Sequence, residues 1–322
     1  MKMVVECGNS QSRVTTNSSG VNVFRKQFSS GRDYQFYNEY FCSMYLHKLA
    51  SGLTTRIVSV NRVHRYIDYE LCAGADDNLV NNNAYLNLVK RIHQLSTPNL
   101  PSAITLNANQ PLVTVEEFLS NCKRRLVNLD SLELVVDDSK FKSIVSDLSR
   151  KLLQICKLLG EKKLCSISCF SQADSGVHNC VIGLDGELLL ADLEYAGIDS
   201  PIKQCIDFLL HPRCQRTTES HQAWWTYFQS EVFDSRDLQL VPCLASALCL
   251  KWAIIMLNEF RPEIWSLRIS ANPSRREVCQ TILQSQFTKS IIYYNKVQDL
   301  LDGAPPYDLF TQNERDILSR SY

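Results

Sequence analysis

The sequence lacks an excess of charge of either sign. Its 322 residues include 34 lysines and arginines against 34 aspartates and glutamates, so the formal net charge is zero. Long runs of one charge are missing as well. Such a chain has no net field to hold a polyanion, and we do not expect it to bind nucleic acid.

Apolar runs long enough for export or for a membrane are missing too. The opening residues, MKMVVECGNSQS, contain no apolar core of signal-peptide length, so we do not expect export by that route. The most apolar stretch, Val241 to Leu257, carries Lys251 in its middle. It is shorter than the roughly 20 residues that cross a bilayer. We therefore predict a buried helix in a soluble protein without a membrane partner.

The 13 cysteines lack the paired CxxC spacing of a zinc site, and Cys165 and Cys169, spaced CxxxC, come closest. Their number is odd and they are scattered along the chain. We interpret them as buried thiols in a reducing cytoplasm. There is also no phosphate loop of the GxxxxGKS/T kind and no internal repeat.

What is present begins with a group of strand signals. Alternating patterns and turn residues predict short strands at Met3–Glu6, Arg13–Thr16, Val21–Phe28, Thr55–Val60 and Tyr66–Leu71. Between the third and fourth strands, helical spacing of Phe36, Tyr40 and Met44 beside Tyr37, Phe41 and Tyr45 predicts an amphipathic helix over 33–49. Residues 73–78, Ala-Gly-Ala-Asp-Asp-Asn, then interrupt the pattern, which predicts a lobe boundary near residue 72.

The rest of the chain is predicted to be mostly helical, over 84–95, 113–129, 141–159 and from Pro201 to the end. Strand and turn signals interrupt the helices between residues 164 and 192. Strands first and helices afterwards are typical of an α+β protein. Because single cores stop growing at roughly 250–300 residues, we expect two of them. The prediction is a small antiparallel-sheet lobe at 1–72 and a mostly helical lobe at 73–322.

The most informative segment is a predicted β-hairpin over 179–192. Asp185-Gly186 lies between two apolar runs, which is a strong signal for a two-residue turn. That turn would place Asn179 opposite Asp192, with Cβ atoms about 4.5–5.5 Å apart. An amide oxygen and a carboxylate at that spacing could hold one hard cation, and magnesium is the natural choice. The alternative is that the two residues only terminate the strands.

The loop before this hairpin, Ser171-Gln172-Ala173-Asp174-Ser175-Gly176-Val177-His178-Asn179, supplies the context. The spacing Asp174-x4-Asn179 resembles the catalytic loop of the kinase superfamily. Together with Asp-Leu-Glu-Tyr at 192–195 and with Asp207 in Asp-Phe-Leu-Leu-His-Pro, the run is similar to bacterial members of the aminoglycoside phosphotransferase/choline kinase family. The resemblance implies a two-lobed, protein-kinase-like fold. It also implies that Asp174 is the catalytic base and that Asn179 and Asp192 bind magnesium.

The same resemblance implies roles in the first lobe. Lys26 closes a predicted strand and Glu39 follows in the next helix. Kinases have the same order, with a strand lysine that binds the nucleotide phosphates and a helix glutamate that orients it. Taken alone, the two residues would be an ordinary edge lysine and a helix-surface charge. Nucleotide contacts are further expected from the Gly8-Asn9-Ser10 loop and from Glu70 and Cys72 in the interlobe hinge.

The chain departs from the family pattern in three places. Gln172 stands where the family usually has histidine, the first loop is poor in glycine, and His178 precedes Asn179 where glycine is common. Asp207 is expected to be structural, tying down the catalytic-loop backbone. Glu194 is either an additional metal neighbour or a solvated charge.

The acceptor cleft is expected on the C-terminal helices, including residues 251–260. On a helix, Trp252, Ile255 and Glu259 lie close to one face, and so do Lys251 and Asn258 with Ile255. These polar groups would either meet a substrate or pair with one another. An aminoglycoside would favour an acidic cleft and choline an aromatic one, and the sequence commits to neither.

The sequence therefore predicts an ATP-dependent phosphotransferase that moves the γ-phosphate to a hydroxyl of a small molecule, such as a sugar or an amino alcohol, with magnesium as cofactor. A catalytically inactive, nucleotide-binding pseudokinase is the alternative. Against a protein kinase, the chain has no arginine before the catalytic aspartate and no DFG or APE sequence. The identity of the acceptor, ATP against GTP and the oligomeric state cannot be inferred from the sequence.

Overall fold

The computed structural model describes residues 4–7, 10–74, 82–96, 108, 114–127, 129, 138–160, 168–214 and 217–320. These residues form two compact units. The first, here called the sheet unit, combines Met1–Pro111 with Ser168–Asp199, and the second, the helical unit, combines Leu112–Ile167 with Ser200–Tyr322. The sheet unit thus contains both the strand-rich first part and the predicted catalytic segment. The lobe boundary near residue 72 stays a prediction.

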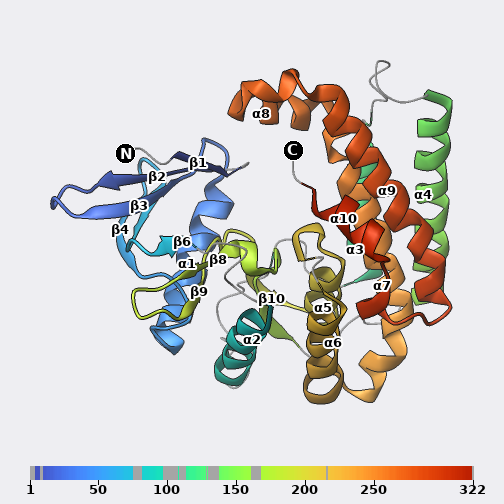
Figure 1. Ribbon diagram of the computed structural model, residues 1–322, viewed down its shortest axis with the longest axis horizontal. Coiled ribbons are helices and arrows are strands. Elements are labelled where there is room, and N and C mark those ends of the chain that lie inside the picture. Colours follow the sequence, from blue (N-terminus) through green and yellow to red (C-terminus); the bar gives the residue numbers. More distant parts are fainter. Residues whose placement is uncertain are drawn as a thin grey trace. The chain divides into compact units, whose positions relative to one another are not determined.

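The sheet unit is built on a five-stranded antiparallel sheet (Figure 1). Its strands follow in the order β1 (Val4–Cys7), β2 (Ser10–Thr16), β3 (Asn22–Gln27), β5 (Tyr66–Tyr69) and β4 (Ile57–Asn61). All five predicted strands are present. Strands that follow each other in the sequence are paired, except β3 and β4, because β5 lies between them. Strand β3 is therefore the central strand of the sheet.

Helix α1 spans Asp33–Leu49, as predicted, but it buries a partly different face. Phe36 packs with Phe28, Ile67 and Tyr69 in a core against the sheet. The other inward positions include the polar residues Asn38 and Glu39, whereas the side chains of Tyr37, Phe41 and Met44 are exposed. Of the predicted apolar face, Phe36 and Tyr40 do pack on this core, whereas Tyr37, Phe41 and Met44 do not. Periodicity of apolar residues missed the rest of the buried face because that part carries ion-pairing and hydrogen-bonding groups.

The remaining elements of the sheet unit are helix α2 and five short strands. Two small sheets have the orders β6-β8-β9 and β10-β7. The bounds are α2 (Asn82–Ser96), β6 (Ala73–Gly74), β7 (Cys169–Ser171), β8 (Cys180–Ile182), β9 (Leu188–Leu190) and β10 (Gly197–Asp199). A 3-10 turn, η2 (Val177–Asn179), precedes β8.

The β8–β9 hairpin exists, but its register differs from the prediction by one residue. Cys180 pairs with Leu190 and Ile182 with Leu188, so the loop has three residues, Leu184 to Gly186. Gly186 adopts a positive φ of 84°, and the Asp185 carboxylate accepts a hydrogen bond from the Glu187 N–H at 3.1 Å. A three-residue loop with glycine in the left-handed position is the next commonest hairpin connection after the two-residue turn. Asn179 therefore does not lie directly opposite Asp192.

The helical unit contains eight described α-helices. They are α3 (Val115–Leu126), α4 (Asp138–Leu159), α5 (Pro201–Leu210), α6 (Thr218–Tyr227), α7 (Ser235–Met256), α8 (Pro262–Ala271), α9 (Cys279–Leu301) and α10 (Gln312–Ser319). Shorter turns connect them at η3 (Pro212–Cys214), η4 (Phe228–Val232), η5 (Leu257–Phe260), η6 (Pro273–Arg276) and η7 (Pro306–Asp308). Strands first and helices afterwards confirm the predicted α+β class.

Helix α7 is the central element of the helical unit and packs against α9, α4 and α5. A capping box closes its first turn, where Asp234 accepts from the Asp237 N–H and the Asp237 carboxylate accepts from the Asp234 N–H. Ser235–Phe260, which joins α7 to η5, is long and apolar enough to cross a membrane. However, 78% of its apolar window is buried inside the structure, which is the pattern of a core helix and agrees with the sequence prediction.

Candidate active site

Lys26 of β3 is the centre of a cluster of carboxylates in the sheet unit. It lies on the inward-facing side of the strand and is 5% exposed. Its Nζ lies 2.6 Å from Asp192 Oδ1, 3.0 Å from Glu39 Oε2 and 3.3 Å from Glu194 Oε2. Burial alone would lower the pKa of Lys26, but the three carboxylates outweigh it and raise the pKa well above its ordinary value. Lys26 is therefore a permanent cation.

Glu39 of α1 is held from two sides. One carboxylate oxygen accepts from Lys26, and the other accepts from the Tyr69 hydroxyl of β5 at 2.7 Å. Burial raises the pKa of Glu39, while Lys26 and the Tyr69 hydrogen bond act in the opposite direction. The structure thus brings together the lysine and the glutamate that the sequence paired, and it makes both of them buried groups.

Glu194 is buried and is not the solvated charge that the sequence left open. Its carboxylate pairs with Lys26 and, at 3.1 Å, with Arg32, which lies at the start of α1. Arg32 also donates to the Tyr195 hydroxyl at 3.0 Å. Two charged residues next to α1 and β3 therefore fix the segment that follows Asp192.

Asn38 makes a second link between α1 and this segment, and sequence reasoning missed it. Its side-chain Nδ2 lies 2.8 Å from the Ala196 carbonyl, 3.2 Å from that of Glu194 and 3.3 Å from that of Leu193. An amide nitrogen carries two hydrogens, so these carbonyls share its donors. The only signal in the sequence was a polar residue beside Glu39, which has no meaning without the distant carbonyls.

Gln172 joins the predicted catalytic loop to the strand end that carries Asp192. Its side-chain nitrogen donates to the carbonyls of Asn179, at 2.9 Å, and Ala191, at 2.8 Å. The amide oxygen accepts from the Tyr85 hydroxyl of α2 at 3.1 Å, which fixes the orientation of the amide. The residue that departs from the family pattern thus has a complete set of partners, and Tyr85 is a further residue that the sequence did not reveal.

Asn179 and Asp192 lie on neighbouring strand ends. The Ala191 N–H donates to the Asn179 carbonyl at 2.9 Å, so Asp192 follows one residue beyond the pair. Asp192 has a left-handed φ of 52°, as has Ala173 with 65°. Such backbone costs about 1–3 kcal/mol and is typical of functional sites.

The side-chain oxygens of Asn179 and Asp192 suit a hard cation. Asn179 donates its side-chain N–H to the Asp174 carbonyl at 2.8 Å, which leaves the amide oxygen as an acceptor. Asp192 contributes a carboxylate that is 36% exposed. These two oxygen ligands are of the type that magnesium prefers. Asp174 itself is 43% exposed, and its carboxylate lies 3.7 Å from the His178 imidazole within the same loop.

Of the other residues that were expected to contact the nucleotide, the structure describes some and not others. Gly8 and Asn9 lie outside the described residues, and Ser10 is buried at the start of β2. The Glu70 N–H donates to the Arg56 carbonyl at 3.0 Å, and the Cys72 thiol donates to the Glu70 carbonyl at 3.7 Å. Backbone groups of Glu70 are thus in use within the protein. The nucleotide contacts of all five residues stay predictions.

Asp207 of α5 lies in the helical unit and is buried. Its carboxylate accepts from Trp252 Nε1 at 3.0 Å and pairs with Lys203 at 3.5 Å and Lys251 at 3.6 Å. Burial lowers the pKa of Lys251, and Asp207 opposes that effect. These contacts give Asp207 a structural part in the packing of α5 on α7, while its link to the catalytic loop stays a prediction.

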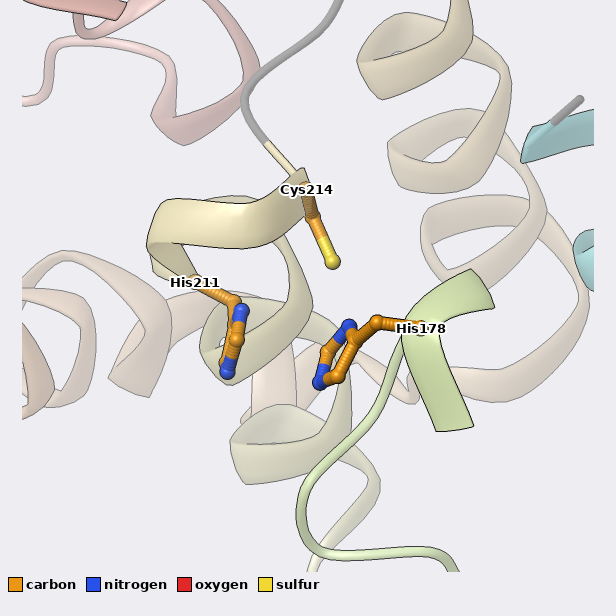
Figure 2. Close-up of side chains that lie close together, drawn as sticks. All are labelled: His178, His211 and Cys214. Atoms are coloured by element: carbon orange, nitrogen blue, oxygen red, sulfur yellow. The ribbon is translucent and has the colours of Figure 1, made fainter. Parts of the chain in front are cut away.

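The end of α5 carries two further polar side chains. Figure 2 shows His211 and Cys214 beside the turn η3, where the Arg213 N–H donates to His211 Nδ1 at 3.1 Å. His178, the third side chain drawn there, belongs to the sheet unit. Because the three residues are divided between two units, we assign no metal site to them.

Like Lys251, two other polar residues of the segment 251–260 have partners within the protein. Arg125 donates to the Asn258 side chain at 3.2 Å, and Glu259 pairs with Arg268 at 2.6 Å and with Arg275 at 3.3 Å. Lys251, Asn258 and Glu259 thus all pair within the protein, which was the second alternative. Trp252, Ile255 and Glu259 nevertheless line one pocket, as described below.

Comparison with known proteins gives a fold and no close relative. No family model matches the chain, and no curated protein matches it in sequence. Among solved structures, a choline/ethanolamine kinase family protein from Mesorhizobium loti has a TM-score of 0.54 at 10% identity, covering 94% of this chain and 93% of that protein. Choline kinase from Cryptosporidium parvum has a TM-score of 0.53 at 12% identity, covering 88% and 91%.

A third similar structure is the ternary complex of the aminoglycoside phosphotransferase APH(2″)-IIa with streptomycin and ATP, with a TM-score of 0.53 at 13% identity, covering 89% of this chain and 92% of that protein. At such identities the likeness concerns the path of the chain and not its substrate. It confirms the fold that the catalytic-loop resemblance implied. The chain has the two-lobed, kinase-like fold of the choline kinases and aminoglycoside phosphotransferases.

Proposed function

We propose that the protein is an ATP-dependent phosphotransferase whose acceptor is a hydroxyl group of a small molecule. The observation that carries this proposal is the cluster in which Lys26 contacts both Glu39 and Asp192. In kinases the corresponding lysine, glutamate and metal-binding aspartate must all be in place for activity. Lys26 and Glu39 are buried charges, which are costly unless paired, so their convergence with Asp192 supports a functional role.

Each residue has a proposed part in the transfer. The acceptor oxygen attacks the γ-phosphorus while its proton passes to the Asp174 carboxylate, and the bond to the bridging oxygen breaks so that ADP leaves. Lys26, oriented by Glu39, binds the nucleotide phosphates. Asn179 and Asp192 would hold magnesium, which when bound neutralises charge on the phosphate oxygens. Catalysis then rests on positioning and on charge neutralisation.

The pseudokinase is the second candidate function, and one observation favours it. Lys26 lies only 2.6 Å from Asp192, so in this structure the carboxylate proposed to bind metal is neutralised by a lysine. In contrast, Gln172, which could have marked a degenerate site, has partners on both sides of the catalytic loop. We therefore favour the active enzyme. We also propose a cytoplasmic location, because the cysteines at the described positions are free thiols.

Thermal unfolding with MgATP and MgGTP tests the proposal. A ligand at 100 times its dissociation constant stabilises the folded state by about 2.7 kcal/mol. We expect a magnesium-dependent rise of the midpoint in the wild type and its loss in Asp192→Ala. Production of ADP with a hydroxylated acceptor then separates the enzyme from the pseudokinase. A wild type that neither nucleotide stabilises would contradict both candidates.

A further inference from the structure

A pocket of about 330 Å³ lies entirely among residues of the helical unit. Its walls come from α7, η5, α8, η6, α9, the turn η3 and the residues around the end of α10. Trp252, Ile255 and Glu259, the face that the sequence assigned to an acceptor, are part of the lining. The volume is at the small end of the roughly 300–1,000 Å³ of ligand pockets, which suits a small metabolite.

The lining of this pocket is rich in cations. Its basic residues are Arg213, Arg268, Arg275, Lys289 and Arg320. Among the described residues that line it, Glu259 is the only one with a carboxylate. Arg268 and Arg275 share one oxygen of that carboxylate, Oε1. One carboxylate cannot neutralise five cations, so the lining carries a surplus of positive charge.

One of these cationic groups has a buried donor for which the described part of the chain offers no acceptor, and another is buried against a carbonyl. Arg275 Nε is buried and has no hydrogen-bond acceptor among the described residues. Lys289 Nζ donates to the Arg320 carbonyl at 2.6 Å, which is an uncharged acceptor. Burial, together with the nearby Arg320 charge, lowers the pKa of Lys289 to about 8. A buried donor without an acceptor is costly, so an anion placed beside Arg275 would supply the acceptor that the described residues do not.

We propose that this pocket binds a small molecule through a phosphate or carboxylate group, and that this molecule is the hydroxyl acceptor; the second part rests on the proposed function. A guanidinium matches either oxyanion through two parallel hydrogen bonds. The side chains of Trp252, Ile255 and Met256 supply apolar surface for the carbon part of the ligand. Such an acceptor is opposite in charge to choline and to the aminoglycosides.

Titration calorimetry on the full chain tests oxyanion binding with four probes. Glycerol 3-phosphate and glycerate carry a hydroxyl and an oxyanion, while glycerol and choline are the uncharged and cationic controls. We expect the oxyanions to bind at least about tenfold more tightly than the controls, because charge-assisted hydrogen bonds are the stronger ones. The tighter of the two oxyanions identifies phosphate or carboxylate as the preferred group.

A matched pair of variants assigns the binding to the pocket. Arg275→Gln should weaken oxyanion binding at least about tenfold. Arg276→Gln changes the next residue of the same η6 turn, which is exposed and does not line the pocket, and should bind as the wild type does. Arg320→Gln, an exposed lining position, gives a second test if Arg275→Gln does not fold. Unchanged binding in the lining variants, or choline binding best, would overturn the proposal.

The same samples separate this inference from the proposed function. MgATP stabilisation of the wild type reports on the sheet unit and does not depend on an acceptor. If MgATP binds but no oxyanion does, the inference fails and the phosphotransferase stands. If oxyanions bind and MgATP does not, the proposed function fails while the pocket is confirmed. If both bind and no probe is phosphorylated, the acceptor part of the proposal is overturned.

Discussion

The two units carry charge clusters of opposite design. In the sheet unit, one cation, Lys26, lies among the carboxylates of Glu39, Asp192 and Glu194. In the helical unit, one carboxylate, Glu259, pairs with two arginines in a pocket that is lined by further basic residues. The first cluster has a surplus of negative charge and the second a surplus of positive charge.

The difference indicates which ligands complete each cluster. A buried ion without an opposite charge costs free energy, and protein packing alone cannot repay it. Carboxylates in excess suit a divalent cation that accompanies a nucleotide, and arginines in excess suit an oxyanion. If each surplus has a ligand of its own, a variant of one cluster should affect one ligand and leave the other alone.

The largest effect is expected for Asp174→Asn, which keeps the shape of the side chain and removes the base. General-base catalysis contributes about 10²- to 10⁴-fold, so phosphoryl transfer should fall by that factor. Stabilisation by MgATP and binding of the oxyanion probe should not change. The exposed Asp185→Asn in the hairpin loop is the matched control. Full turnover in Asp174→Asn would refute the role of Asp174 as base.

Lys26→Met should have the next largest effect, now on stability. Three carboxylates would remain within reach of an apolar side chain, and breaking a buried ion pair costs about 3–5 kcal/mol. The loss should grow as the pH rises, because the carboxylates then give up their protons, and millimolar Mg²⁺ should restore part of it. Urea unfolding measures both, with the exposed Lys48→Met of α1 as control. Equal stability of the two variants would mean that the cluster is not tightly coupled.

Gln172→Glu should lower the rate by roughly 10- to 100-fold. The new carboxylate has no N–H to offer the carbonyls of Asn179 and Ala191, so both strand ends that are proposed to bind metal lose a positioning contact. A positioning role predicts a higher magnesium concentration for half-maximal rate, which general destabilisation would not produce. Gln172→His, which restores a ring N–H donor, should recover much of the rate. Identical magnesium dependence in all three proteins would exclude this role.

The sequence predicted the elements of this site better than their orientation. The bounds of α1 followed from helical spacing, but much of its buried face did not. Glu39 turns inward to Lys26 and Tyr69 on the sheet, and Asn38 turns inward to carbonyls that lie more than 150 residues away. Periodicity detects apolar faces and has no signal for a polar residue with distant partners. The order of Lys26, Glu39, Asp174, Asn179 and Asp192 was recognisable only because motifs keep their spacing.

The hairpin illustrates a second limit. Asp-Gly is compatible with a two-residue turn and with a three-residue loop whose last position is left-handed, and the two differ by one residue in register. The structure has the second, with Gly186 at φ 84°. The pairing argument for Asn179 and Asp192 was therefore wrong in detail. The two residues still lie on adjacent strand ends, because Asn179 bonds to Ala191 and Asp192 follows it.

Glu259→Gln should weaken the helical unit modestly and strengthen its anion binding. Arg268 and Arg275 would lose their shared carboxylate, which we expect to cost about 1–3 kcal/mol. Inorganic phosphate should then stabilise the variant more than the wild type, because the freed guanidinium groups become available. Thermal unfolding across a phosphate series measures this difference, and MgATP stabilisation should remain as in the wild type. A smaller phosphate response than that of the wild type would contradict the charge surplus.

The smallest effect concerns Lys289, a cation of the pocket that is bonded to a carbonyl. Its pKa of about 8 in the folded protein lies below the 10.5 of the unfolded chain, so between these values the unfolded state binds more protons. Stability should therefore rise with pH across this window in the wild type relative to Lys289→Met. Solvent screens Lys289, and the nearby Arg320 charge also contributes to the shift of its pKa. We therefore expect the free energy of unfolding to change by well under the ~1.4 kcal/mol per pH unit that the release of one full proton would give.

Urea unfolding of both proteins at pH 8, 9 and 10 measures this slope, and its ligand dependence sharpens the contrast between the two clusters. An oxyanion beside Lys289 would favour its charged form and raise its pKa. Glycerol 3-phosphate should therefore flatten the pH dependence of the difference, whereas MgATP, which is proposed to bind at the carboxylate cluster, should leave it unchanged. A slope that responds to MgATP and not to the oxyanion would place the anion-binding function outside this pocket.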